Sequence, residues 1–175
     1  MRRLLILRHA KSDWPGGTQD FDRPLARRGL SAAPAMGRYL KTEGLLPDFA
    51  IVSAARRTIE TWELVRAELG EETPFRIEAS IYEAPVERLI SVIRGAAPAV
   101  ATLLIVGHNP GCEELASDLT GYGDRFAAQR MGQRYPTAGL AVLDFDVDDW
   151  SLLAERSGRL DRFVTPASLG QGPDE

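Results

Sequence analysis

The sequence predicts an α/β sandwich with a mainly parallel central sheet, and three observations support this fold class. Short apolar runs typical of buried strands alternate with longer segments in which apolar residues recur every three to four positions, as in amphipathic helices. The 175 residues, of which 44% are hydrophobic, can bury a sizeable core, so we expect a single domain over residues 1–175. Two of the apolar runs also end beside a histidine, where open α/β sheets bind ligands.

The first half of the chain predicts three strands and two helices in alternation. The first strand covers residues 3–7, and a polar loop from residue 11 to residue 23 follows it. A helix is expected over residues 31–44, with Pro34 in its first turn, where a missing N–H costs little. The order then continues with a strand at 48–53, a helix at 57–68 and a strand at 75–78.

The second half continues the alternation and ends in polar sequence. We expect a helix at 85–94, a strand at 102–106, a helix at 112–119 and a last strand at 139–146. Residues 121–136 are polar and predict an irregular side wall or lid, in which Arg125, Arg130 and Arg134 are solvated. From Ser157 the chain is turn-rich, and residues 170–175 predict a frayed end.

Composition excludes several classes of protein. The net charge of −4 argues against a general nucleic-acid binder, so any anion site must be a local cluster of arginines. The single cysteine, Cys112, allows no intrachain disulfide and fits a reducing compartment. Only four apolar residues separate Arg3 from Arg8, too few for a signal-peptide core, and no run is long enough to span a membrane. We therefore expect a cytoplasmic protein without a membrane partner; the oligomeric state stays open.

The chain contains only two histidines, and each follows a predicted strand. His9 comes after residues 4–8 and His108 after residues 103–107, so we expect both imidazoles to open into one crevice at the strand ends. Arg8 directly precedes His9, which makes phosphate the first ligand to consider. A neutral imidazole can attack phosphorus, and a guanidinium can hold phosphoryl oxygens with paired hydrogen bonds. The alternative is a histidine that hydrogen-bonds only to the backbone at the strand end.

A second source of arginine lies between residues 53 and 61, where the chain leaves a strand and opens a helix. Helix N-termini favour anions because of their free N–H groups and the helix dipole. Of Arg56 and Arg57, one is expected to point into solvent and the other to reach the crevice of Arg8. Two histidines and two arginines at strand-to-loop transitions are hard to explain by packing alone.

These segments together resemble the histidine phosphatase superfamily, with its phosphoglycerate-mutase-like fold, and within it the small SixA-type phosphohistidine phosphatases. The resembling segments, which extend over most of the chain in the expected order, are Leu7-Arg8-His9-Ala10-Lys11-Ser12, Asp22-Arg23-Pro24-Leu25 through Arg28-Gly29, Ser53 to Thr61, and Val106-Gly107-His108-Asn109-Pro110. The resemblance implies a three-layer α/β sandwich. Ala10, where many members have glycine, and Ala54, in place of the usual proline, depart from the family pattern.

The resemblance also implies roles for individual residues. His9 would be the nucleophile that becomes phosphorylated, and Arg8 and Arg57 would bind the phosphoryl group. His108 would donate a hydrogen bond to the transferring oxygens, while Ser12 and Asn109 would lie at the substrate-binding edge. For the general acid, Glu83 is the best candidate by position; Asp13 and Asp22 in the first loop compete with it.

The expected function is a metal-independent phosphatase with a phosphohistidine intermediate, whose substrate is phosphohistidine on a protein. Two histidines without a cysteine pair or a carboxylate-rich motif make a poor zinc site, so no metal and no cofactor are expected. Two alternatives remain: a phosphatase or mutase for a small phosphorylated metabolite, and a phosphoprotein-binding module without turnover.

Overall fold

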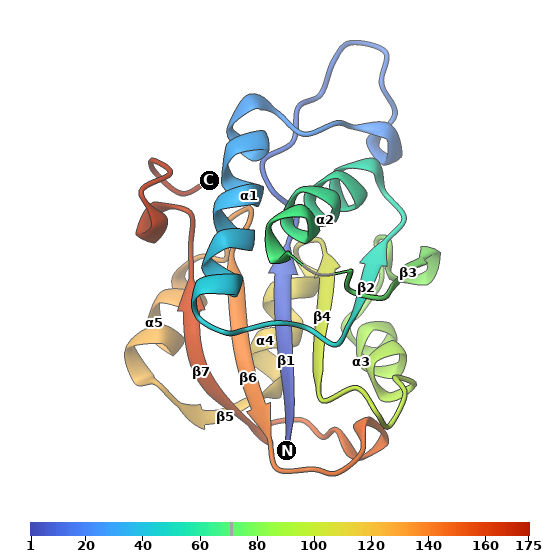
Figure 1. The fold of residues 1–175 in the computed structure, drawn as a ribbon, viewed down its shortest axis with the longest axis vertical. Coiled ribbons are helices and arrows are strands. Elements are labelled where there is room, and N and C mark those ends of the chain that lie inside the picture. The colour runs from blue at the N-terminus through green and yellow to red at the C-terminus, as the bar shows by residue number, and fades with distance from the viewer. Residues whose placement is uncertain (71) are drawn as a thin grey trace.

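The computed structural model describes residues 1–70 and 72–175 and has a β-sheet between two layers of helices (Figure 1). The seven strands of this part of the chain are β1 (Arg2–Arg8), β2 (Phe49–Ser53), β3 (Phe75–Glu78), β4 (Thr102–Gly107), β5 (Thr120–Gly123), β6 (Leu140–Phe145) and β7 (Gly158–Val164). Its five α-helices are α1 (Arg27–Thr42), α2 (Arg56–Leu69), α3 (Val86–Arg94), α4 (Gly111–Leu119) and α5 (Arg125–Gln133). Short 3₁₀ helices cover Asp20–Asp22, Ala79–Ile81, Trp150–Leu152 and Ala167–Leu169.

The sheet is mainly parallel, as predicted. Its strand order is β3-β2-β4-β1-β6-β7-β5. The pairs β3–β2, β2–β4, β4–β1 and β7–β5 are parallel, and β6 runs antiparallel to both of its neighbours. The strands β2, β4 and β1 are consecutive in the sheet and parallel, so their carboxyl ends lie side by side along the same side of the sheet.

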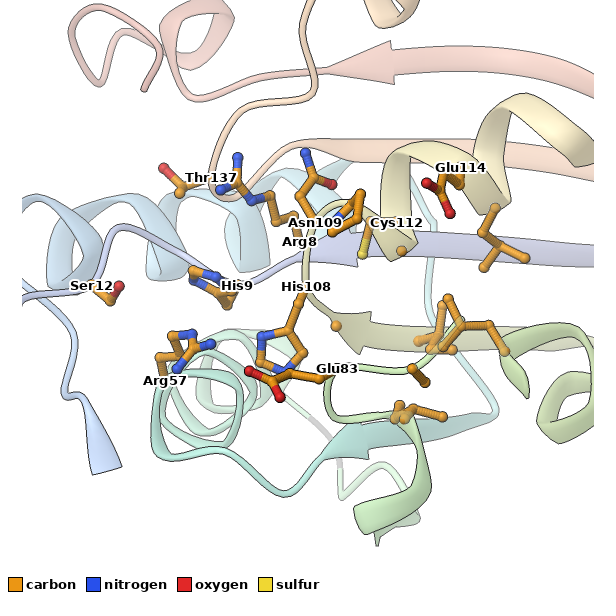
Figure 2. A pocket seen from close by; sticks show the side chains of 18 of the residues that line it. Arg8, His9, Ser12, Arg57, Glu83, His108, Asn109, Cys112, Glu114 and Thr137 are labelled. Atoms are coloured by element: carbon orange, nitrogen blue, oxygen red, sulfur yellow. The ribbon is translucent and has the colours of Figure 1, made fainter. Parts of the chain in front are cut away.

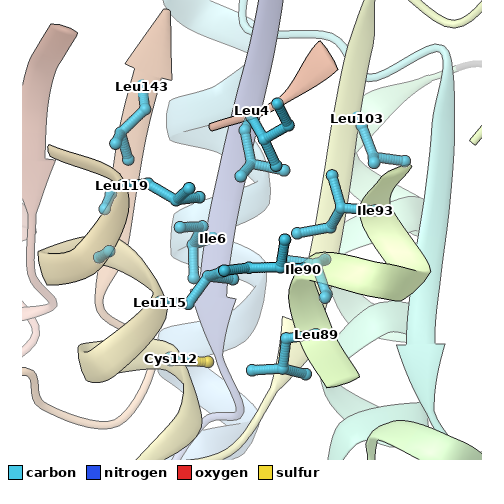
Figure 3. Close-up of a cluster of buried hydrophobic side chains, with 14 of the residues drawn as sticks. Leu4, Ile6, Leu89, Ile90, Ile93, Leu103, Cys112, Leu115, Leu119 and Leu143 are labelled. Carbon is cyan, nitrogen blue, oxygen red and sulfur yellow. The ribbon is translucent and has the colours of Figure 1, made fainter. Parts of the chain in front are cut away.

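Alternate residues of the central strand serve two separate apolar cores. Leu5 and Leu7 of β1 pack with residues of α1 and α2, whereas Leu4 and Ile6 pack with residues of α3, α4 and α5 (Figure 3). Successive side chains of a strand point to opposite faces, so a continuous apolar run in β1 indicates a sheet covered on both faces. This arrangement confirms the three-layer sandwich.

Helix α1 begins four residues earlier than the sequence predicted, at Arg27 instead of residue 31. Pro34 therefore lies in the interior of the helix and not in its first turn. A proline there removes the hydrogen bond to the carbonyl four residues earlier, on Leu30. Leu30 is half exposed, so water can replace the missing N–H donor.

The expectation of an irregular segment at residues 121–136 is wrong, because β5 and α5 lie there. The Asp124 carboxylate caps α5 by accepting hydrogen bonds from the N–H groups of Phe126 and Ala127, both at 2.9 Å. Ala127 and Met131 are buried and hold the helix against β7. Only two of nine helix residues are buried, so the apolar periodicity was too weak to predict the helix. Arg125 and Arg130 on this helix are exposed, and so is Arg134, which follows it.

The predictions for the C-terminal region are also wrong, since β6 is not the last strand and residues 170–175 are not frayed. Strand β7 carries Arg159, whose charge the sequence pattern assigns to a loop, but its guanidinium lies 2.7 Å from the Asp144 carboxylate of β6. Glu175 is held through both its backbone and its side chain. Its carbonyl accepts from the Thr137 N–H at 2.9 Å, and its carboxylate pairs with Arg28 at 2.8 Å.

Candidate active site

A cavity of about 710 Å³ opens at the carboxyl ends of β1, β4 and β2 (Figure 2). One part of its wall is polar and carries the residues of the predicted phosphate site, and the rest is largely apolar. The polar and charged side chains that line it are Arg8, His9, Lys11, Ser12, Asp20, Arg23, Arg57, Glu83, His108, Asn109, Glu114 and Thr137.

The pairing of β1 with β4 brings the two histidines together. Arg8 and Gly107 are partners in the parallel register, and the His9 N–H donates to the Gly107 carbonyl at 2.9 Å. The centroids of the His9 and His108 rings lie 5.4 Å apart. Both imidazoles therefore face one crevice, as the strand-end positions predicted.

His9 is held as a neutral ring with one free nitrogen. Its Nδ1 lies 2.7 Å from the carbonyl oxygen of Ala10, which can only accept, so Nδ1 carries the proton and Nε2 has a free lone pair. Burial lowers the pKa of His9 well below its ordinary value, and the charges of His108, Arg8 and Arg57 add to the effect. At neutral pH the ring is thus uncharged and can act as a nucleophile.

The two neighbouring arginines at the start of α2 have different surroundings. Arg56 is exposed and pairs with Glu60 one turn along the helix at 2.9 Å, whereas the Arg57 side chain is only 7% exposed and lines the cavity. The Thr61 hydroxyl accepts from the Ala10 N–H at 3.0 Å and donates to the Arg57 carbonyl at 2.7 Å. This threonine therefore joins the start of α2 to the turn that holds His9.

His108 is oriented through its other ring nitrogen. Its Nε2 lies 2.7 Å from the hydroxyl oxygen of Ser53, at the end of β2. Burial lowers the pKa of His108 to about 4, and the charge of Arg57 is the next contribution. Nδ1 of this ring is buried without a hydrogen-bond partner. The two histidines thus present opposite ring nitrogens to the cavity.

Three buried side-chain nitrogens without partners come together in this cavity. Among the described residues, five buried side-chain nitrogens lack a hydrogen bond, and three of them are Arg8 Nε, Arg57 Nε and His108 Nδ1. The Arg8 guanidinium is anchored by donation from Nη1 to the Tyr135 carbonyl at 2.9 Å, and burial lowers its pKa. Leaving a buried donor unpaired costs about 1–3 kcal/mol, so the two arginine nitrogens would stabilise an anion in the cavity. His108 Nδ1 is a third donor when the Ser53 hydroxyl donates to Nε2 of this ring.

The sequence did not predict the hydrogen-bonded group that Asp20, Arg23 and Tyr82 form beside Arg57. The Asp20 carbonyl and carboxylate accept from Arg57 at 2.7 and 3.2 Å, and its carboxylate also accepts from Tyr82 at 2.5 Å and Arg23 at 3.2 Å. The Tyr82 hydroxyl bond, followed by the arginines, lowers the pKa of Asp20 to about 2, and burial raises that of Tyr82 to about 12. Asp20 lies in the polar loop predicted over residues 11–23, and no local pattern shows that this loop folds back onto Arg57.

The three candidates for the general acid are separated by the structure. Glu83 lines the cavity from a backbone with a φ of 51°, uncommon for a residue other than glycine. Asp13 and Asp22 do not line it; Asp13 accepts from the N–H of Trp14 instead. Asp20 lines it, but its low pKa keeps it ionised.

Ser12 and Asn109 both lie at the edge of the cavity. The Ser12 hydroxyl accepts from Arg23 at 2.9 Å. The Asn109 amide donates to the Tyr135 carbonyl at 3.1 Å and accepts from the Glu113 N–H at 3.2 Å. Both polar ends of Asn109 therefore have protein partners and hold the turn after β4.

Residues 1–70 and 72–175 contain no group of three or more histidine, cysteine, aspartate or glutamate side chains that could hold a metal ion. None of their helices combines the length and apolar character needed to cross a bilayer.

Comparisons with known proteins give consistent results. Residues 4–89 match the model of the histidine phosphatase superfamily (branch 1). An uncharacterised protein from Mycobacterium leprae is 36% identical over 165 residues, which cover 91% of this chain and 99% of the relative. Two similar solved structures, both with a TM-score of 0.80, are putative phosphohistidine phosphatases SixA. The one from Agrobacterium tumefaciens is 28% identical and covers 94% of this chain and 98% of its own; the one from Nakamurella multipartitia is 26% identical, with coverages of 94% and 96%.

Proposed function

The chain belongs to the histidine phosphatase superfamily and is a phosphatase, and we propose that it acts through a covalent phosphohistidine formed at Nε2 of His9. The family and the phosphoglycerate-mutase-like fold expected from the sequence motifs are both confirmed. The observation that carries the mechanism is the group of unpartnered buried nitrogens on Arg8, Arg57 and His108 around an imidazole whose Nε2 is unprotonated. Such an arrangement is complementary to a phosphoryl group under attack by His9.

The reaction has two in-line steps. In the first, the Nε2 lone pair of His9 forms a bond to phosphorus, the bond to the leaving group breaks, and the leaving group departs with its electron pair and a proton. In the second, water attacks the phosphohistidine, the P–N bond breaks, and neutral His9 and inorganic phosphate are released. Donation from Arg8, Arg57 and His108 stabilises the charge on the equatorial oxygens in both steps.

We assign the proton for the leaving group to Glu83. Its carboxylate lies beside His108 in the cavity, and it is the only one of the three predicted candidates that lines the cavity (Figure 2). An oxygen leaving group departs as an alkoxide or phenoxide unless it is protonated, so it depends on this acid. An imidazole leaving group can be protonated beforehand and depends on it less.

The proposed substrate is phosphohistidine carried by a protein. Two observations support it. The similar solved structures at 28% and 26% identity are described as putative phosphohistidine phosphatases. The cavity is bordered by exposed side chains, among them Glu83, Pro85 and Glu114, so a side chain on another protein can reach it. A small phosphorylated metabolite is the competing substrate class.

The decisive experiment measures turnover in the presence of a chelator on a phosphohistidine-bearing protein, an aryl phosphate and a sugar phosphate. We expect wild type to favour the phosphohistidine protein and His9→Ala to be inactive. Rapid quenching with labelled substrate should trap a phosphoenzyme that is acid-labile and base-stable, and it should be absent from His9→Ala. Preference for the sugar phosphate would replace the substrate proposal, and turnover by His9→Ala would overturn the mechanism.

The neighbouring arginines supply a matched control. Arg57→Ala removes a buried guanidinium from the cavity and should lower kcat/KM about 10²–10³-fold. Arg56→Ala removes an equal charge one residue away, outside the cavity, and should leave kcat/KM unchanged. Equal effects of the two changes would show that general charge, and not a bound phosphoryl group, explains the role of this helix end.

A further inference from the structure

The cavity is much larger than the phosphate site at its polar end. Volumes of 300–1,000 Å³ are typical of pockets that enclose a whole small-molecule ligand, and this cavity measures about 710 Å³. A phosphoryl group between His9, Arg8 and Arg57 occupies a small part of that space. The remaining space must accommodate something else, and its lining indicates the chemistry of that group.

Away from the phosphate site the lining of the cavity is apolar, and we call this part the apolar branch. Ala84 and Pro85 are its accessible side chains, and Leu89, Ile105, Cys112 and Leu115 form its floor, each no more than 5% exposed. These residues come from the loop before α3, from α3, from β4 and from α4. Leu89, Ile105 and Leu115 are buried in the core between the sheet and these helices. Hydroxyl or carboxylate groups placed against this wall would lose their hydrogen bonds to water without replacement, whereas apolar groups would be stabilised.

The glycines beside the branch are closely packed by its lining. A Cβ at Gly111 would lie 3.0 Å from Leu89 Cδ1, and a Cβ at Gly107 would lie 3.4 Å from the Cys112 sulfur, so these side chains fill the space next to the glycines. Ala84 lines the cavity with the shortest side chain after glycine, so a larger side chain at this position would enter the cavity. Leu89 and Cys112 face each other at this end of the core (Figure 3).

The branch leads away from the nucleophile. Figure 2 passes from Ser12 and His9 at one side, through His108 and Glu83, to Cys112 and Glu114 at the other. A leaving group in an in-line transfer departs on the side of phosphorus opposite the attacking atom. The branch lies beside Glu83, to which we assign the proton for that group, so the leaving group is the part of the substrate that can enter it.

Charge at the branch further restricts what can enter. The basic residues that line the cavity, Arg8, Lys11, Arg23 and Arg57, belong to its polar end, whereas the carboxylates of Glu83 and Glu114 border the branch. Both glutamates are exposed. An anionic leaving group would be repelled by this border, while an uncharged one would not.

We propose that the apolar branch binds an uncharged aromatic or aliphatic part of the leaving group and thereby sets substrate preference. The proposal rests on the proposed function, because it takes the phosphoryl group to be bound at His9. In a protein substrate, the group in the branch is an apolar side chain next to the phosphorylated residue; in a small substrate, it is an aryl ring.

The first test fills the branch with Ala84→Phe and compares 1-naphthyl phosphate with phosphoramidate, whose leaving group is ammonia. The difference in intrinsic reactivity between the two substrates cancels, because both substrates are measured with wild type and with Ala84→Phe. We expect kcat/KM for naphthyl phosphate to fall about tenfold or more, with little change for phosphoramidate. Ala97→Phe, an equal change at an exposed position outside the cavity, should alter neither. Equal effects of Ala84→Phe on both substrates would overturn the proposal.

A second experiment, with peptide substrates, identifies the source of the apolar group. Two phosphohistidine peptides that differ only in leucine or serine beside the phosphohistidine are compared in wild type and Ala84→Phe. Loss of a leucine preference in the variant assigns the branch to a protein side chain. The same preference in both enzymes, with naphthyl phosphate still affected, assigns it to an aryl ring of a small substrate.

A second variant keeps the proposal testable if Ala84→Phe does not fold. Glu114→Lys reverses one exposed charge at the branch and leaves the apolar core intact. Wild type should prefer 4-methylphenyl phosphate to 4-carboxyphenyl phosphate, and Glu114→Lys should reduce this preference several-fold. Glu87→Lys, an exposed site on α3 outside the cavity lining, is the matched control. An unchanged preference in Glu114→Lys would contradict the role of the border.

The outcomes separate this proposal from the preceding one. If phosphoramidate and phosphohistidine are turned over through His9 but no variant changes preference, the mechanism stands and the branch proposal fails. If neither nitrogen-linked substrate is turned over but naphthyl phosphate depends on both His9 and Ala84, the branch stands and the phosphohistidine substrate fails.

Discussion

The ends of β1 and β4 are neighbours in the sheet and each carries a histidine, yet the protein holds the two rings in different ways. At the end of β1 a backbone carbonyl accepts a hydrogen bond from Nδ1 of His9, which leaves Nε2 with a free lone pair. At the end of β4 the Ser53 hydroxyl is hydrogen-bonded to Nε2 of His108, which leaves Nδ1 without a partner. A carbonyl can only accept, whereas a hydroxyl can also donate and so allow the proton to reside on Nδ1. The hydrogen-bond partner, more than the position in the fold, separates a nucleophile from a donor.

The largest effect should come from removing the ring at the end of β1. His9→Gly should lower turnover at least about 10⁴-fold, because the variant lacks the ring at which the covalent intermediate forms. Free imidazole, which can enter the space left by the side chain, should restore part of the activity. The measurement is steady-state turnover with and without imidazole. Rescue of His108→Gly to a similar extent would show that the two strand ends are not specialised as proposed.

Removing the ring at the end of β4 should have a smaller effect. His108→Gln replaces a donor to the equatorial oxygens and should lower kcat about 10²–10³-fold. The nucleophile remains, so labelled substrate should still form a phosphoenzyme at His9, only more slowly. Single-turnover kinetics with rapid quenching measure both steps. Complete absence of phosphoenzyme in this variant would assign His108 a part in forming the nucleophile.

The two rings should also lower stability in acid. The pKa of His108 is about 4, so as pH falls below 6.5 an unfolded histidine binds a proton while folded His108 does not. The free energy of unfolding should therefore decrease between pH 6.5 and pH 4, by about 3 kcal/mol for this residue alone. Denaturant titrations of wild type and His108→Gln across this range isolate its share.

The same prediction can be checked on the rings themselves. With two histidines in the chain, a ¹⁵N imidazole NMR titration gives two pairs of ring-nitrogen signals, which the His108→Gln variant assigns to the two rings. Neither ring should titrate near pH 6.5. A normal titration of either one would contradict the burial that separates both from solvent.

Elements around these strand ends could be predicted closely, because their signals are local. Strand β2 was expected at 48–53 and lies at Phe49–Ser53, since a short apolar run between polar residues identifies it. Strand β7 was missed because its charges are neutralised across the sheet, as in the pairing of Arg159 with Asp144. Spacing along one segment cannot show a partner on another strand.

The candidate site also contains residues that local sequence signals predict and residues that depend on contacts between distant segments. The motif positions of His9, Arg8, Arg57 and His108 placed all four in one cavity from the sequence. The contacts of Asp20 could not be predicted, because they depend on how a loop folds back onto α2. Ser53 was noted only as the start of a motif, although it orients a ring 55 positions away.

Ser53 allows the smallest and most specific test of the difference between the strand ends. Ser53→Ala removes the hydroxyl at Nε2 of His108 and should lower kcat about tenfold, the effect of about one hydrogen bond. In the His108→Gln background the same change should cost much less, because the ring it positions is absent. The ¹⁵N spectrum of the single variant Ser53→Ala should show a changed proton distribution between the ring nitrogens of His108 and unchanged signals for His9. Additive losses in the double variant, or an altered His9 signal, would mean that Ser53 acts on the whole cavity and not through His108.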